Sequence, residues 1–149
     1  MYQKKLIGLT LAALLACPAL SSADALEDAV DYRSGVMEVM GWNLRQIGAM
    51  LKGDQPMDPK VLARRAQDLN SAAHLDILAG FPEDSVSDES DAKDEIWLDW
   101  ETFTEHLDNV RRHAKVLAEA ARKNDPQATS AAFNELRKAC KACHQDFRK

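Results

Sequence analysis

The residues in this sequence with the most distinctive chemistry are two cysteines and a histidine near the C-terminus. Cys140 and Cys143 are separated by two residues, and His144 follows directly. Two thiols at this spacing can each add to one vinyl group of a haem, and the histidine that follows can coordinate the iron. The pattern is typical of c-type haem attachment. It predicts one covalently bound haem c per chain, with His144 as an iron ligand.

Three other uses of the cysteine pair stay open at this point. A thioredoxin-like redox pair needs a βαβ context, and the sequence shows no strand signal. A structural zinc site needs further ligands, and His74, His106 and His113 are available, although none belongs to a second ligand pair. We expect these three histidines to be solvated surface residues. A structural disulfide is common in exported proteins, but it would leave His144 without a role.

The N-terminal segment has the features of a secretory signal peptide. Lys4 and Lys5 precede an apolar run over residues 6–15 that is too short to span a membrane, and small residues follow at 21–25. We expect residues 1–23 to be removed, with cleavage after 25 as a variant. The mature domain is then 24–149 and is periplasmic. The alternatives are an N-terminal membrane anchor and lipidation at Cys17.

Composition and charge exclude several classes of function. Removal of the two N-terminal lysines leaves 17 basic residues against 24 acidic ones, a net charge of −7. An acidic surface disfavours nucleic acid and anionic membranes as partners. No arrangement of a nucleophile and a base indicates an enzyme. We therefore expect a protein that, after signal removal, binds neither nucleic acid nor membrane and has no enzymatic activity.

The spacing of apolar residues predicts the elements that must position the cysteine pair. Helical periodicity extends over four stretches, at about residues 26–52, 59–77, 95–123 and 126–149. Asp58 and Asp125 each precede a proline and are expected N-caps. A solvated acidic loop is expected over 80–94. These features favour an all-α fold, an antiparallel up-down-up-down four-helix bundle. We expect the tryptophans to be packing residues: Trp42, Trp97 and Trp100.

With these motifs the chain resembles the cytochrome c' family, the class II c-type cytochromes. The similarity covers essentially the whole mature chain and rests on five segments: Tyr32-Arg33, Met40-Gly41-Trp42-Asn43, Met50-Leu51-Lys52-Gly53, Glu95-Ile96-Trp97, and residues 140–148. The resemblance implies a four-helix bundle with haem near its C-terminal end. It implies thioethers at Cys140 and Cys143 and makes His144 the proximal axial ligand.

The resemblance also implies roles for three further residues. Arg33 matches a residue near a haem propionate, Met37 matches the position that caps the distal face, and Arg148 matches a basic residue that flanks the proximal face. One segment departs from the family. Many members have Leu-Pro-Trp or Gly-Pro-Gly-Thr between the second and third helices, where this chain has residues 75–82 and then an acidic stretch.

The sixth coordination position of the iron decides the function that the resemblance implies. A closed, apolar distal side implies five-coordinate iron that binds NO and, less strongly, CO, with NO scavenging and electron transfer as further roles. Alternatively, Met37 or Met40 is the sixth ligand, and the protein is a low-spin electron carrier. The family also implies redox partner proteins and a homodimer formed through the first two helices.

Overall fold

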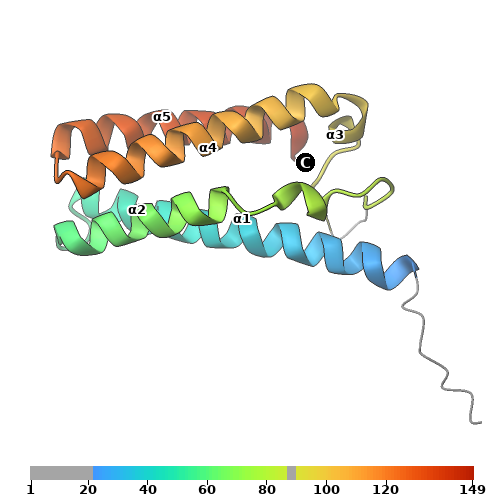
Figure 1. Cartoon of the computed structure of the whole chain (residues 1–149), viewed down its shortest axis with the longest axis horizontal. Helices are drawn as coiled ribbons and strands as arrows, with labels where there is room; N and C mark the ends of the chain where they lie inside the picture. Colours follow the sequence, from blue (N-terminus) through green and yellow to red (C-terminus); the bar gives the residue numbers. More distant parts are fainter. Residues whose placement is uncertain (1–21, 87–89) are drawn as a thin grey trace, which may run out of the picture.

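The computed structural model describes residues 22–86 and 90–149, so the predicted signal peptide lies almost entirely outside the described residues. Six helical segments follow one another along the chain: α1 (Ser22–Lys52), α2 (Pro59–Ala73), the 3₁₀ helix η1 (Ile77–Gly80), α3 (Glu95–Leu98), α4 (Trp100–Arg122) and α5 (Pro126–Phe147) (Figure 1). None of the described helices is long and apolar enough to cross a membrane.

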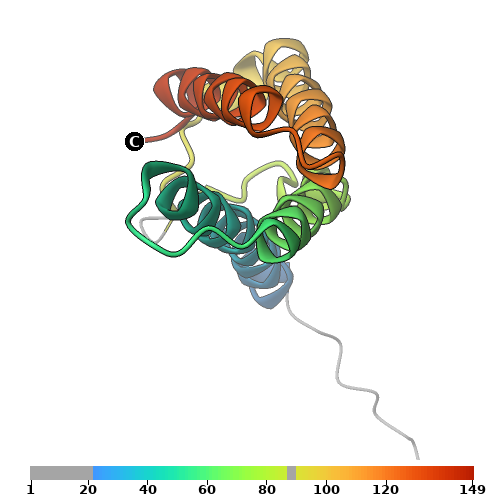
Figure 2. The ribbon, with the colours of Figure 1, turned by 90° about the vertical axis from the view of Figure 1, so that its left-hand side faces the viewer.

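The four long helices form an antiparallel bundle, which confirms the predicted fold. They surround a common axis in the order α1, α2, α4, α5 (Figure 2). Close backbone contacts join α1 to α2, α2 to α4, and α4 to α5. In the described part of the chain, α1 and α5 make far fewer such contacts. The α1–α5 side is therefore the most open side of the bundle.

Two of the helices, α2 and α5, begin at the prolines of the two aspartate–proline pairs, as the sequence predicted. The Asp58 carboxylate accepts hydrogen bonds from the backbone N–H groups of Lys60 and Val61 at 2.8 and 3.2 Å, and caps α2. The Asp125 carboxylate accepts one from the Ala128 N–H at 2.9 Å and caps α5. Each cap satisfies backbone donors that the helix cannot, which contributes about 1 kcal/mol to stability.

The predicted third helix is wrong in one respect, because a break at Asp99 divides it. This residue leaves helical geometry, with φ −133° and ψ 59°. Its carboxylate accepts a hydrogen bond from the Thr102 N–H at 3.3 Å, so it acts as the N-cap of α4. Neither proline nor glycine marks the break, and apolar periodicity alone therefore could not reveal it. Ile77, predicted as the end of the second helix, lies instead in η1.

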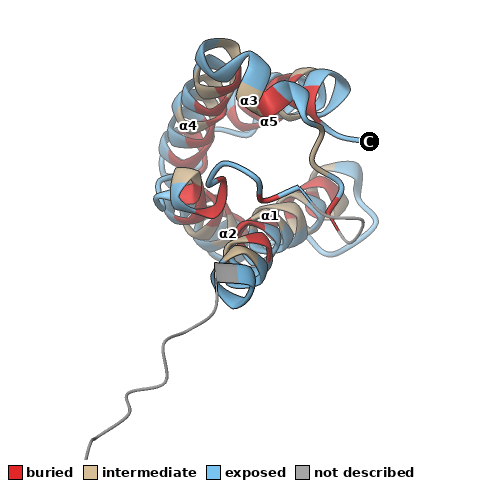
Figure 3. Ribbon diagram, turned by 90° about the vertical axis from the view of Figure 1, so that its right-hand side faces the viewer, coloured by how far each residue is buried: buried red, intermediate tan, exposed pale blue. Residues whose placement is uncertain are grey.

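Two apolar clusters fill the bundle, and buried residues line its inside (Figure 3). The first core lies among the four long helices and includes Ile47, Leu69, Leu117 and Leu136. The second core joins α1, α3, α4 and α5 to η1 and the residue after it. Its buried members are Val36, Ile77, Phe81, Ile96, Phe103, Leu107, Cys143 and Phe147. The second core therefore contains one of the two cysteines.

Candidate haem-attachment site

The cysteine pair lies in the last turns of α5, where helical spacing directs the two thiols to different surroundings. Cys143 is 5% exposed and belongs to the second core. Cys140 is half-buried and packs against the first core. Both are free thiols. His144, one turn after Cys140, is exposed. The helix thus holds two thiols and an imidazole within five residues of one another.

A groove of about 510 Å³ lies beside these residues, between α5 and α1. From α1, Leu44 lines this groove. The remaining lining comes from α5 and the residues that follow it: Arg137, Cys140, Lys141, His144, Gln145, Arg148 and Lys149. Four of these carry positive charge. A groove with a thiol and an imidazole on its wall and cations around it suits an apolar macrocycle that carries carboxylates.

Burial keeps both thiols protonated. Burial raises the pKa of Cys140. Burial, followed by the neighbouring Cys140 and Asp146, raises the pKa of Cys143 to about 11. The thiolate is the form that exchanges disulfides and binds metals, so these thiols are poorly suited to either role at neutral pH. Thioether formation, which adds S–H across a vinyl double bond, ends with an uncharged sulfur that suits an apolar core.

The surroundings of His144 favour the neutral imidazole that binds iron. Its side chain is exposed, but nearby protein atoms still displace water from it. This partial burial, and after it the positive charge of Arg148, lower the pKa of His144. A neutral imidazole has a lone pair available for a metal. The fourth residue after His144, Arg148, thus lies close enough to influence the predicted ligand.

Two methionines of α1 lie in the same region as the cysteine pair. Met37 and Met40 are partly buried and pack against the second core, and Met40 also packs against the first. Both therefore lie on the side of α1 that faces the bundle interior. The roles of Met37 and Met40 toward iron stay predictions.

Arg33 is buried against the chain that follows η1. Its two terminal nitrogens donate to the carbonyl and hydroxyl oxygens of Ser85, at 2.6 Å each, and to the carbonyl of Gly80 and the hydroxyl of Ser90, at 2.7 Å each. Its guanidinium also lies 4.8 Å from the ring centre of Phe81. Burial lowers the pKa of Arg33. Among the described residues Arg33 is thus a loop anchor, and its predicted position near a propionate stays a prediction.

A second set of contacts, which the sequence did not predict, connects the loop to the end of α5. Ala92 and Arg148 form an isolated antiparallel bridge. The Arg148 Nε donates to Asp91 Oδ2 at 3.0 Å, and the Lys93 ammonium donates to the carbonyls of Gln145 and Asp146 at 3.1 Å each. No signal in the sequence indicates these pairs, because they depend on the path of the loop.

Two expectations for single side chains need correction. His106 is not a solvated surface residue: its Nε2 lies 3.2 Å from Asp146 Oδ2, and its ring meets the Phe147 ring edge-on at 5.8 Å. Trp42 and Trp100 are both more than a third exposed, so packing is only part of their role. Trp97 fits the expectation better, because it is half-buried and its indole N–H donates to the Phe81 carbonyl at 3.2 Å.

The alternatives for the cysteine pair find little support in this geometry. The described residues contain no group of three or more side chains that could hold a zinc ion. The same residues contain no β-strand to supply a thioredoxin-like context. The thiols, the imidazole, the apolar second core and the cationic groove instead fit a covalently attached haem.

Comparison with known proteins decides the family. The family model for cytochrome c' matches residues 28–148. The chain belongs to the cytochrome c' family. A cytochrome c' from Halomonas halodenitrificans is 37% identical over 130 residues, which cover 82% of this chain and 96% of the relative. A cytochrome c-554 from Cereibacter sphaeroides is 29% identical over 139 residues and covers 91% and 90%. Membership confirms the resemblance and implies a covalently bound c-type haem.

Solved structures of cytochrome c' have the same fold. Cytochrome c prime from Shewanella frigidimarina superposes with a TM-score of 0.80 at 31% identity, over 83% of this chain and 96% of that one. The nitric oxide complex of a mutant cytochrome c prime from Alcaligenes xylosoxidans gives 0.76 at 29% identity, over 83% and 96%. The helix order found here is therefore that of a cytochrome c' four-helix bundle.

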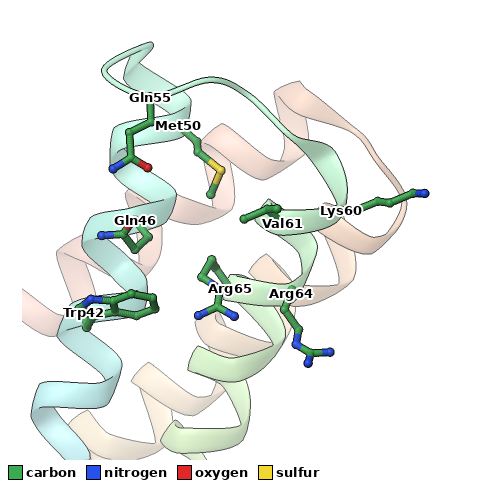
Figure 4. A pocket seen from close by; sticks show the side chains of 8 residues that line it. All are labelled: Trp42, Gln46, Met50, Gln55, Lys60, Val61, Arg64 and Arg65. Carbon is green, nitrogen blue, oxygen red and sulfur yellow. The ribbon is translucent and has the colours of Figure 1, made fainter.

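A second groove, of about 360 Å³, lies between α1 and α2 (Figure 4). The Arg65 guanidinium lies 5.1 Å from the ring centre of Trp42. The groove contains neither cysteine nor histidine, and its lining residues are Trp42, Gln46, Met50, Gln55, Lys60, Val61, Arg64 and Arg65. It therefore lacks the chemistry of a haem-attachment site and is a separate surface.

Proposed function

We propose that this chain is a periplasmic c-type haem protein whose five-coordinate iron binds NO and, less strongly, CO. Cys140 and Cys143 hold the haem through thioethers, and His144 is the proximal ligand. The observation that carries the proposal is the groove beside these residues on α5, next to an apolar second core. NO scavenging and one-electron transfer are the roles that follow from such a site.

The residues of this chain determine what can bind at the site. When bound, the haem supplies an iron atom that takes diatomic gases. The second core excludes water, and its buried side chains are apolar apart from the Cys143 thiol. Haem pockets without a hydrogen-bond donor stabilise bound O₂ poorly, whereas NO needs no such donor. The two terminal nitrogens of Arg33, a buried cation of α1, already donate to carbonyl oxygens of Gly80 and Ser85. This setting favours NO.

Covalent attachment is tested with single-cysteine variants. The exported protein keeps its haem through denaturation and gel electrophoresis, because a thioether survives unfolding. The variants Cys140→Ala and Cys143→Ala each keep one thioether, and the double variant loses all haem on denaturation. A double variant that still carries covalent haem would contradict the assignment. The His144→Ala variant is the matched control, because it changes the spectrum while haem stays attached.

The second candidate function is a low-spin electron carrier with methionine as the sixth ligand. Met37 and Met40 favour it, because both are partly buried and pack against the second core, which contains Cys143. Met37→Ala and Met40→Ala separate the two functions. In the five-coordinate protein neither substitution changes the spin state of the ferric spectrum. A change from low spin to high spin in one variant would identify the substituted methionine as the sixth ligand. Electron transfer would then replace NO binding as the proposed function.

We also place the mature protein in the periplasm as a homodimer. The basic and apolar N-terminal segment supports export. The dimer is expected to form through α1 and α2, where Trp42 and Val61 expose apolar surface beside the second groove.

A further inference from the structure

The junction of α3 and α4 exposes apolar surface that neither core uses. Leu98 is 83% exposed, the largest exposure of any large hydrophobic side chain in the described residues. Trp100, two residues later, is 39% exposed. The break at Asp99 produces this exposure, because it ends α3 after one turn and starts α4 in a new direction. Single exposed apolar residues are common, so the surroundings must show whether these two have a role.

The surroundings are strongly acidic. Of the described residues from Glu83 to Asp108, nine are acidic and one, Lys93, is basic. One of the nine, Asp91, forms an ion pair with Arg148. Lys93 is held by carbonyls at the end of α5. We call Leu98, Trp100 and the exposed acids beside them the elbow surface; these acids are Asp94, Glu95, Asp99 and Glu101. An apolar centre with an acidic rim complements a protein surface with an apolar centre and a basic rim.

A chain of packed rings joins the elbow surface to the haem-attachment site. The ring centres of Trp100 and Phe103 are 5.6 Å apart, and those of Phe103 and Phe147 are 5.3 Å apart. Phe147 belongs to the second core together with Cys143, four residues earlier on α5. Packed aromatic rings therefore connect the exposed Trp100 indole to the core that contains Cys143, where a thioether is predicted.

We propose that the elbow surface docks an electron-transfer protein that has a basic rim around an apolar centre. The proposal rests on the haem attachment proposed above. A haem held by Cys140, Cys143 and His144 would supply one electron in its ferrous form and become ferric, and the oxidised metal centre of the partner would accept that electron. No bond forms or breaks. The cations around the α5 groove repel the same partner, so docking on that side of the molecule is disfavoured.

The test uses a strongly basic class I c-type cytochrome as the probe. Its His/Met iron has a raised reduction potential, so its ferric form accepts the electron. Binding is measured first between the two ferric proteins, by calorimetry and by NMR shifts. Electron transfer from the ferrous protein is then followed by stopped flow at several salt concentrations. The elbow variants are Leu98→Ser and the double variant Glu95→Gln with Glu101→Gln, which leave the Asp99 cap in place.

The matched controls are Val116→Ser and Glu119→Gln, exposed residues of α4 that lie about four or more helical turns from the elbow. Each elbow variant is expected to weaken binding and slow electron transfer by about threefold or more, with a steep loss at high salt, because the rim steers the encounter. The controls stay at the wild-type rate. NMR shifts in the haem protein are expected at Leu98 and at the Trp100 indole.

Three results would overturn the proposal. Elbow and control variants with equal affinities would do so, and so would shifts confined to the α5 groove or to α1 and α2. A change in sedimentation of Leu98→Ser alone would show that a second copy of this chain covers the elbow. Haem content is measured in every sample. A chain without haem contradicts the proposed function, whereas calorimetric binding of the probe still tests the elbow surface.

Discussion

At the scale of single residues, the site depends on how deeply each reactive group is buried. Cys143 lies in an apolar core that keeps its thiol protonated, whereas His144 is exposed beside a groove where a ligand can reach it. Two adjacent residues therefore have opposite environments, because successive positions on a helix differ by about 100°. The Cys-x-x-Cys-His spacing thus places one proposed anchor, Cys143, inside the bundle and the proposed iron ligand, His144, at its surface.

The raised thiol pKa values predict slow alkylation of the haem-free folded chain. An unperturbed thiol is half ionised near pH 8.5, whereas Cys143 reaches that point at about pH 11. Because the folded state holds its proton more tightly than the unfolded state, the free energy of unfolding falls as pH rises from about 9 to 11. Iodoacetamide labelling followed by mass spectrometry measures both thiols, with the urea-unfolded chain as control. Equal rates for folded and unfolded chains at pH 8 would contradict this burial.

At the scale of elements, the spacing between α1 and α5 sets the groove. Near the α1–α2 turn the two helices approach, and a Cβ added at Gly48 would lie 2.9 Å from Cζ of Phe133. About one helical turn before Gly48 on α1, Leu44 lines the groove together with Cys140 of α5. A glycine at one end of the pair and an open groove at the other indicate that α1 and α5 diverge toward the cysteines.

Two glycines of α1 make a matched test of this packing. Gly48→Ala is expected to lower the free energy of unfolding by about 1–2 kcal/mol, because Phe133 must move. Gly35→Ala meets nothing within 4 Å and is expected to raise the same quantity by about 0.5–1 kcal/mol, because alanine favours the helix. Urea titrations of both variants give the two values. A stabilising Gly48→Ala would show that the helices are not in close contact there.

The elements that local signals determine could be predicted, and those that depend on distant contacts could not. The carboxylates of Asp58 and Asp125 cap α2 and α5 by accepting hydrogen bonds from backbone N–H groups two or three residues later, so the local sequence sufficed to predict both starts. The cysteines and His144 were recognisable because their spacing lies within one helix. The Asp99 break and the Arg33 anchor were not, because they depend on how α4 and the loop pack.

At the scale of the whole molecule, three surfaces have different chemistry. The α5 groove has a cationic rim, and the elbow surface has an acidic rim. The α1–α2 groove combines apolar residues with arginine (Figure 4). On the proposals above, the haem occupies the α5 groove, a redox partner the elbow surface and a second copy of the chain the α1–α2 groove, so the three would not compete.

The dimer proposal predicts that a charge in the α1–α2 groove dissociates the protein. Val61→Glu introduces a carboxylate on each side of the expected interface, where two copies would repel each other and lose apolar contact. Sedimentation velocity is expected to show monomers for this variant and dimers for wild type. Val116→Glu, at a similarly exposed site on α4, is the control and should stay dimeric. A dimeric Val61→Glu would place the interface elsewhere.

The central claim is a haem on Cys140, Cys143 and His144 with an open sixth position. The most direct measurement is the optical spectrum of the mature protein, ferric and ferrous, with and without NO. A high-spin spectrum that shifts when NO is added is the result expected here. A low-spin spectrum with sharp ferrous bands that does not respond to NO would contradict the claim and show that a residue of the chain, such as Met37 or Met40, occupies the sixth position.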